Sequence, residues 1–220
     1  MKNYSGSRLQ SWAAITLSFL ITVCFVRLFE YFTVASKYFL EHSYRYELAG
    51  IFYDAWAALI YCFVFLLIFF LISLWSKKVA GFTFHLLNII MIILYLSLII
   101  VFSERTRPFD HEFFTRKAAD SWITAKQMLS TGFTVLIPFV IYLTGYFLLY
   151  FLIKRIEFRK WQSVTLACLS LLAVIFFKFS IPSISNFSQP GAYYLESNKF
   201  SYWINDSYNY FRTRDHFNSG

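Results

Sequence analysis

Cysteine, histidine and charge are all scarce in this sequence, and each scarcity excludes a class of protein. The 220 residues include three cysteines, all within apolar runs, so neither a disulfide framework nor a cysteine-based metal cluster is expected. The four histidines have no close spacing, which argues against a zinc site. Only 15% of the residues are charged, and no nucleophile stands next to a base as a self-contained enzyme would require.

Apolar and aromatic residues are present in excess. They make up 58% and 23% of the chain, with 28 phenylalanines, whereas a soluble domain is about 45–50% apolar. One small core cannot bury them all, so the surplus is expected to face lipid. The net charge of +8 is confined to the segments between apolar runs, which indicates membrane topology rather than binding to nucleic acid.

Five apolar stretches are long enough to cross a bilayer, which takes roughly 20 residues. They cover residues 12–32, 50–75, 80–102, 133–153 and 164–181. No small-residue cleavage site follows the first stretch, so we expect a retained helix rather than a signal peptide. The sequence therefore predicts an all-α membrane protein, with a five-helix transmembrane domain over 1–182 and an extracytoplasmic linker over 183–220.

The distribution of basic residues predicts the orientation. If the N-terminus lies inside, the inner segments carry one acidic residue, Glu157, and eight basic ones. The basic residues are Lys2, Arg8, Lys77, Lys78, Lys154, Arg155, Arg159 and Lys160. Because short, Lys- and Arg-rich connections stay in the cytoplasm, we expect the N-terminus inside and the C-terminus outside.

The second outer connection, residues 103–132, is unusually rich in charge. Within it, residues 113–129 have the spacing of an amphipathic helix that would lie in the membrane interface. Arginine can hold a lipid phosphate in a bidentate manner, so this connection is a candidate headgroup site. The candidate residues are Arg105, Arg107, Asp110, His111, Glu112, Arg116 and Lys117. The alternative is a solvated loop whose charges pair with one another.

Two charged residues inside apolar runs are expected to lie at similar depth. Arg27 is near the outer end of the first span and Asp54 is near the start of the second. A carboxylate within a span is costly and faces a partner or a cavity. The pair could therefore line a headgroup pocket, form a structural ion pair with Glu30 competing for Arg27, or leave Asp54 as a helix cap at the interface.

Three short motifs resemble a known family. They are Asp110-His111-Glu112-Phe113-Phe114 followed by Arg116-Lys117 and Asp120, then GIFYDAW from Gly50, and NKFSYWINDSYNYF from Asn198. Together with the five-helix plan they are similar to the membrane part of the lipoteichoic acid synthase-like phosphoglycerol transferases, a branch of the sulfatase/alkaline phosphatase superfamily. The resemblance implies a bacterial cytoplasmic (inner) membrane.

The resemblance also implies an extracellular catalytic domain with a threonine nucleophile and a manganese ion, which would begin where this sequence stops at Gly220. No catalytic residue and no cofactor are therefore expected within the chain. The function expected is to anchor such an enzyme and to bind its lipid donor, an anionic phospholipid. The alternatives are a non-catalytic assembly subunit that binds a partner protein and, with less support, a small transporter.

Overall fold

The structure is a computed structural model that describes residues 8–34, 43–105, 107–108, 110–111, 136–156 and 159–218. The described residues are almost entirely helical and contain no β-strand. The helices are α1 (Arg8–Val34), α2 (Ser43–Trp75), α3 (Lys77–Arg105), α6 (Leu136–Arg155), α7 (Lys160–Ile175), α8 (Pro190–Glu196) and α9 (Lys199–Asn218). Two 3₁₀ helices, Phe177–Ser180 and Ile184–Asn186, connect α7 to α8.

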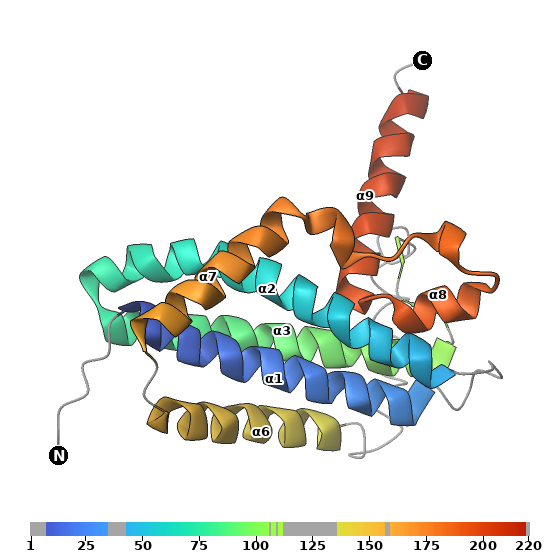
Figure 1. Cartoon of the computed structure of the whole chain (residues 1–220). Helices are drawn as coiled ribbons and strands as arrows, with labels where there is room; N and C mark the ends of the chain where they lie inside the picture. The colour runs from blue at the N-terminus through green and yellow to red at the C-terminus, as the bar shows by residue number, and fades with distance from the viewer. Residues whose placement is uncertain are drawn as a thin grey trace.

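The long helices form one bundle. In Figure 1, α1, α2, α3 and α6 run along a common axis in alternating directions, and α7 crosses the bundle at an angle. Helix α1 contacts α2, α3 and α6, while α2 also contacts α7 and α8. We call the end that carries the connection from α2 to α3 the turn end, and the opposite end the α8 end.

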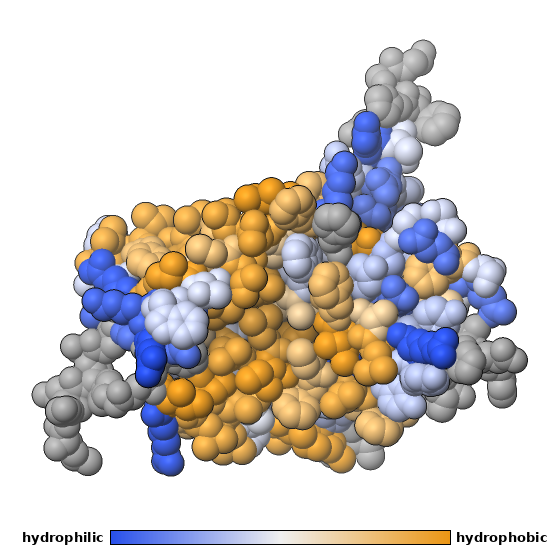
Figure 2. Space-filling view, in the orientation of Figure 1, coloured by the Kyte–Doolittle hydropathy of each residue, from blue (hydrophilic) through white to orange (hydrophobic). Residues whose placement is uncertain are grey.

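Four helices confirm predicted spans. Arg8–Val34, Tyr44–Trp75, Lys77–Glu104 and Leu136–Arg155 are long and apolar enough to cross a membrane. At about 1.5 Å per residue, even the shortest reaches the roughly 30 Å of a bilayer core. Figure 2 shows an apolar surface over the middle of the bundle, with hydrophilic residues towards both ends. These features indicate a multi-pass membrane protein.

The fifth predicted span differs from the structure. Its helix, α7, has 16 residues and ends at Ile175, where a span reaching residue 181 was expected. The apolar run continues past this point, but its backbone changes to the 3₁₀ helix Phe177–Ser180. Hydropathy does not distinguish these two helix types, which is why the sequence overestimated the α-helical length.

The C-terminal segment packs on the α8 end. Helix α8 contacts α2, and α9 begins beside it and extends to one side of the bundle (Figure 1). Residues 200–211 are helical and belong to α9. Its exposed apolar side chains include Ile204, Tyr208 and Phe211, which share one helix face because they are four and three residues apart.

A polar cluster also lies among the apolar side chains that join α3 to α6. The Asn88 amide donates a hydrogen bond to the Tyr146 hydroxyl at 3.1 Å, and His85 Nδ1 lies 2.7 Å from the same oxygen. Asn88 and Tyr146 are fully buried. His85 therefore takes part in a structural hydrogen-bond network between two helices.

Candidate functional site

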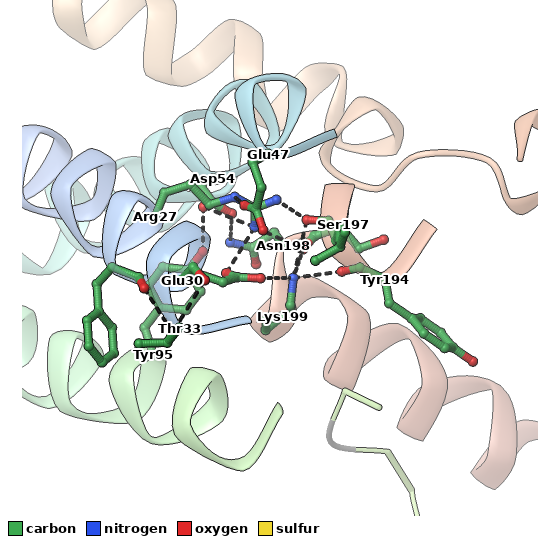
Figure 3. A network of polar contacts seen from close by, with 12 residues as sticks. Arg27, Glu30, Thr33, Glu47, Asp54, Tyr95, Tyr194, Ser197, Asn198 and Lys199 are labelled. Atoms are coloured by element: carbon green, nitrogen blue, oxygen red, sulfur yellow. Dashed lines mark hydrogen bonds and ion pairs between the residues drawn. The ribbon is translucent and has the colours of Figure 1, made fainter. Parts of the chain in front are cut away.

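The most strongly polar part of the interior lies at the α8 end and is centred on Arg27 of α1 (Figure 3). Arg27 Nη1 is 3.1 Å from Glu30 Oε2, and Nε is 2.8 Å from Glu47 Oε2. Nη1 is also 3.6 Å from Asp54 Oδ2. Arg27 is only 1% exposed, so three carboxylates surround one buried guanidinium.

Arg27 also holds the C-terminal segment. Its guanidinium donates hydrogen bonds to the backbone carbonyls of Leu195 and Ser197, which are 168 and 170 residues away in sequence. These carbonyls lie at the end of α8, where the last turn of a helix leaves its carbonyls without partners inside the helix. A buried cation is well suited to this position, because it also complements the negative end of the helix dipole.

Lys199 is the second buried cation of the network. Its Nζ lies 2.5 Å from Glu30 Oε1 and donates to the carbonyls of Tyr194 and Ser197 at 2.7 and 2.9 Å. The ammonium also sits over the Phe102 ring of α3, 4.5 Å from its centroid. Lys199 thus joins α1, α3 and α8 at the first residue of α9.

Asp54 of α2 is held by three neighbours. Besides Arg27, the Tyr95 hydroxyl donates to Oδ2 at 2.5 Å and the Asn198 amide donates to Oδ1 at 2.8 Å. The Asn198 carbonyl oxygen in turn accepts a hydrogen bond from the Ser201 backbone N–H at 2.7 Å. Asn198 therefore caps the start of α9 and ties that helix to α2 at the same time.

The structure brings Arg27 and Asp54 together as an ion pair, and Asp54 does not cap its helix. Helix α2 begins at Ser43, so Asp54 lies about three turns inside it and the capping alternative is wrong. Glu30 binds Arg27 as the sequence spacing suggested, without displacing Asp54. Three carboxylates and two backbone carbonyls already contact the guanidinium. Arg27 therefore has few donors left for a lipid phosphate.

Burial sets the proton affinities of the groups that come from the C-terminal segment. It lowers the pKa of the Lys199 ammonium, against the attraction of Glu30. It also raises the pKa of Glu196, a half-buried carboxyl on α8, while a hydrogen bond from Tyr53 acts in the opposite direction. Both shifts have the same cause, since desolvation disfavours the charged form of either group.

The predicted headgroup residues are not part of this network. Glu112, Arg116, Lys117 and the expected amphipathic helix at 113–129 lie outside the described residues. Arg105 is the last residue of α3, and Arg107 follows it with an exposed side chain. The structure therefore leaves a phosphate site in this connection as a hypothesis.

Asp110 and His111 lie beside α9. The backbone N–H and Nδ1 of His111 are both 2.8 Å from Asp206 Oδ2. The His111 ring stacks on Tyr210, with centroids 4.3 Å apart and an interplanar angle of 15°. These contacts attach the connection that follows α3 to the C-terminal helix, which residue spacing could not predict.

No metal-binding group appears among the described residues. Within them, no three His, Cys, Asp or Glu side chains are arranged to hold a metal ion. The carboxylates of the network are paired with Arg27 and Lys199 instead. The residues described here thus do not fit the manganese of the resembled enzymes, which the resemblance assigns to a different domain.

Sequence reasoning missed four members of the network: Glu47, Tyr95, Asn198 and Lys199. Glu47 and Asp54 are seven residues apart and Arg27 and Glu30 three apart, so each pair shares a helix face, and this signal was available. Nothing in the spacing could connect Lys199 to Glu30, however, because the two are separated by most of the chain.

Comparisons with protein-family models, with curated proteins and with solved structures find no match to this chain. The network must therefore be interpreted from its own geometry. It binds the C-terminal segment to the bundle through buried charges. Its evident capability is to fix the position of α8 and α9.

Gly50 of α2 leaves the space that the Arg27 guanidinium occupies. A Cβ at Gly50 would overlap the Arg27 guanidinium, which ion pairs hold in place, whereas a Cβ at Gly81 of α3 meets nothing within 4 Å. We expect Gly50→Ala to lower the free energy of unfolding by about 1–3 kcal/mol. Gly81→Ala should be neutral or stabilising by up to about 1 kcal/mol.

The measurement is unfolding of both variants by denaturant in the same detergent micelles. Equal stability of Gly50→Ala and Gly81→Ala would show that the guanidinium can move aside at little cost, and that the network is not tightly packed.

Proposed function

We propose that this chain is the membrane domain of a phosphoglycerol transferase-like enzyme, and that it anchors the enzyme and holds its lipid donor at the α8 end. The observation that carries the proposal is the attachment of α8 and α9 to the bundle. A segment that merely connected two domains would not need Lys199 fully buried against Glu30. Such an attachment suits a domain that must be held at a fixed place above the membrane.

The resemblance of the sequence motifs supports the same proposal. The Gly50 and Asp54 of the GIFYDAW motif, and the Asn198 of the NKFSYWINDSYNYF motif, all contact the Arg27 network or belong to it. Two motifs that are far apart in the sequence thus share one structural task. This is expected if they were retained together as parts of one membrane domain.

The proposed orientation places the turn end in the cytoplasm. Arg45 and Arg107 lie at the α8 end, but the short connections at the turn end, at the starts of α3 and α7 and the end of α6, carry six basic residues. They are Lys77, Lys78, Lys154, Arg155, Arg159 and Lys160. The basic residues of short connections remain on the cytoplasmic side, so the α8 end faces outwards.

A fifth crossing is part of the proposal and is made by α7 with the 3₁₀ helix that follows it. Sixteen α-helical residues span about 24 Å, and four 3₁₀ residues add about 8 Å. The sum matches a bilayer core of roughly 30 Å. The C-terminal segment would then lie outside the bacterial cytoplasmic membrane, as an appended extracellular domain requires.

The lipid donor is proposed to approach the α8 end through the basic residues of the second outer connection. Arg107 is exposed at this end, next to the last turn of α3. Arg105, Arg116 and Lys117 complete the proposed cluster from the sequence. An anionic phospholipid is the chemical class that such a cluster would select.

A non-catalytic assembly subunit is the second candidate. The observation that favours it is the exposed apolar face of α9 formed by Ile204, Tyr208 and Phe211, which could bind a partner protein. Under this alternative, the network would position α9 for that partner rather than for an enzyme domain.

Controlled proteolysis of the native polypeptide tests the proposed function. An N-terminal tag is added at the chromosomal gene, and intact cells are treated with a protease that cannot cross the membrane. We expect a tagged polypeptide several tens of kilodaltons larger than the 26.1 kDa of this chain. Protease should remove the additional mass and leave the tag protected.

The appended domain and the orientation each have an outcome that contradicts them. A native polypeptide of 26.1 kDa would contradict an appended transferase domain and favour the assembly subunit. Loss of the tag in intact cells would show that the N-terminus lies outside. Cells opened before treatment provide the control, because the tag must then become accessible.

A further inference from the structure

A groove between α1 and α2 at the α8 end has an unusual combination of walls and floor. Its volume is about 160 Å³, and Leu28 of α1 with Tyr44 and Leu48 of α2 form much of its wall. These three side chains are 42%, 44% and 60% exposed, so the groove opens on the outer surface of the bundle. Arg27 and Glu47 also line it and bring two charges to an otherwise apolar site.

Glu47 is the incompletely satisfied acceptor that lines this groove among the described residues. It is only 4% exposed, and within the described chain neither of its carboxylate oxygens accepts a hydrogen bond. Oε2 lies 2.8 Å from Arg27 Nε as an ion pair, while Oε1 has no hydrogen-bond partner in the part of the chain that the structure describes. A buried carboxylate oxygen in this state is costly and calls for a donor.

The charges of the network point to a cationic donor. Three buried carboxylates, on Glu30, Glu47 and Asp54, face two buried cations, Arg27 and Lys199. One negative charge is left over when all five are ionised. Glu30 and Asp54 each accept hydrogen bonds from side chains of the network, so the uncompensated charge falls on Glu47, which faces the groove.

The position of the groove near the start of α2 favours a lipid as the source of that cation. Glu47 is about one turn inside α2, or roughly 6 Å below its first residue. In a bilayer that covers the apolar middle of the bundle, this level would lie near the lipid headgroups, and the exposed leucines of the wall would face the acyl chains. A metal ion would need several oxygen ligands, whereas the described wall is mainly apolar and aromatic.

We propose that this groove binds the ammonium group of an amine-bearing phospholipid, with Glu47 accepting its hydrogen bonds. An ammonium supplies three donors and the missing positive charge. The leucine walls hold the first carbons of the lipid. The proposal does not depend on the transferase-like assignment, and it concerns a site distinct from the anionic donor proposed near Arg107.

Lipid retention by the purified full-length protein tests this site. The protein is exchanged into nanodiscs of phosphatidylcholine containing equal small fractions of phosphatidylethanolamine and phosphatidylglycerol, and retained lipids are counted by native mass spectrometry. Phosphatidylethanolamine should be enriched about tenfold over phosphatidylcholine, because one charge-assisted hydrogen bond contributes at least that factor. Enrichment of phosphatidylglycerol instead, or of neither lipid, would overturn the proposal.

Two variants locate the effect. Glu47→Gln should abolish the enrichment while the protein stays folded, since it leaves two carboxylates facing two cations. Leu48→Trp, which fills the groove from an exposed position, should abolish it without changing any charge. Glu196→Gln is the matched control, because this carboxyl lies on α8 outside the groove, and its enrichment should equal that of the unmodified protein.

Free ethanolamine distinguishes the two sources of an amine. If it displaces phosphatidylethanolamine at millimolar concentration, the site recognises the amine alone; if it does not, the lipid chains contribute to binding. Unchanged enrichment in both Glu47→Gln and Leu48→Trp would contradict the proposal. Glu47 would then hold a proton rather than an ammonium ion.

Discussion

Replacing Lys199 with methionine is expected to lower the free energy of unfolding by about 3–5 kcal/mol, the usual cost of breaking a buried ion pair from one side. The ammonium lies 2.5 Å from Glu30 Oε1 and binds the carbonyls at the end of α8. Methionine has a similar volume, but it brings neither a positive charge to Glu30 nor hydrogen bonds to the α8 carbonyls. Denaturant unfolding in mixed micelles measures the loss.

Lys199→Met should lower the free energy of local opening of α8 and α9 by more than it lowers the free energy of global unfolding. Backbone amides of residues 190–207 should lose their protection from hydrogen exchange before those of α1 to α3, because the variant removes the attachment of α8 and α9. Local openings of this kind require less free energy than global unfolding. A uniform change along the whole chain would contradict the docking role given to Lys199.

Two further variants show whether the effect belongs to the ion pair. Lys178→Met removes an exposed lysine from the same half of the chain and should change stability by less than about 0.5 kcal/mol. Adding Glu30→Gln to Lys199→Met should recover part of the loss, because it removes the carboxylate left without its ammonium. The double variant could instead lose more free energy of unfolding than the two single variants lose together. In that case the Glu30–Lys199 pair is not the source of the loss seen in Lys199→Met.

Replacing Arg27 with methionine should be more damaging still. It would leave Glu30, Glu47 and Asp54 buried around an apolar side chain, and it would free the carbonyls of Leu195 and Ser197. We expect a loss of about 5 kcal/mol or more, which approaches the whole stability of a typical protein. The amount of folded protein recovered from membranes and its unfolding midpoint are the measurements.

Arg27→Lys separates charge from geometry. Lysine keeps the positive charge but is a compact point donor, whereas the planar guanidinium reaches several acceptors at once. We therefore expect only partial recovery relative to methionine. Full recovery would show that the network needs a charge at this position and no particular shape.

Arg45→Met is the matched control for both Arg27 variants. Arg45 is an exposed arginine in the first turn of α2, close to the same end of the bundle. Its loss should be nearly neutral, as for most exposed positions. A comparable loss at Arg27 and Arg45 would contradict the importance of burial in the network.

The sequence predicted the centres of the long helices better than their ends. Hydropathy placed the start of the second span at Gly50, yet α2 begins at Ser43. The intervening turns carry Arg45 and Glu47, which a hydropathy scale assigns to a loop. Arg27 pairs with Glu47 in the fold, so a charge that looked like a helix boundary lies inside the helix instead.

The candidate site was predicted only in part for a related reason. Arg27 and Asp54 were found because a charge within an apolar run is costly wherever it lies. Lys199 and Asn198 stand in a polar segment, where charge and amide groups are ordinary, so nothing marked them as buried. Their burial follows from the docking of α8 and α9 on the bundle.

What the sequence alone determined is the set of local properties: apolar runs of membrane-spanning length, helical periodicity and the concentration of basic residues in short connections. Each of these depends on residues that are neighbours in the chain. Only the tertiary structure decided which charges became buried partners. Glu30 and Lys199 stabilise each other only because the α8 end brings opposite parts of the chain together in a place without water, where an unpaired charge is costly.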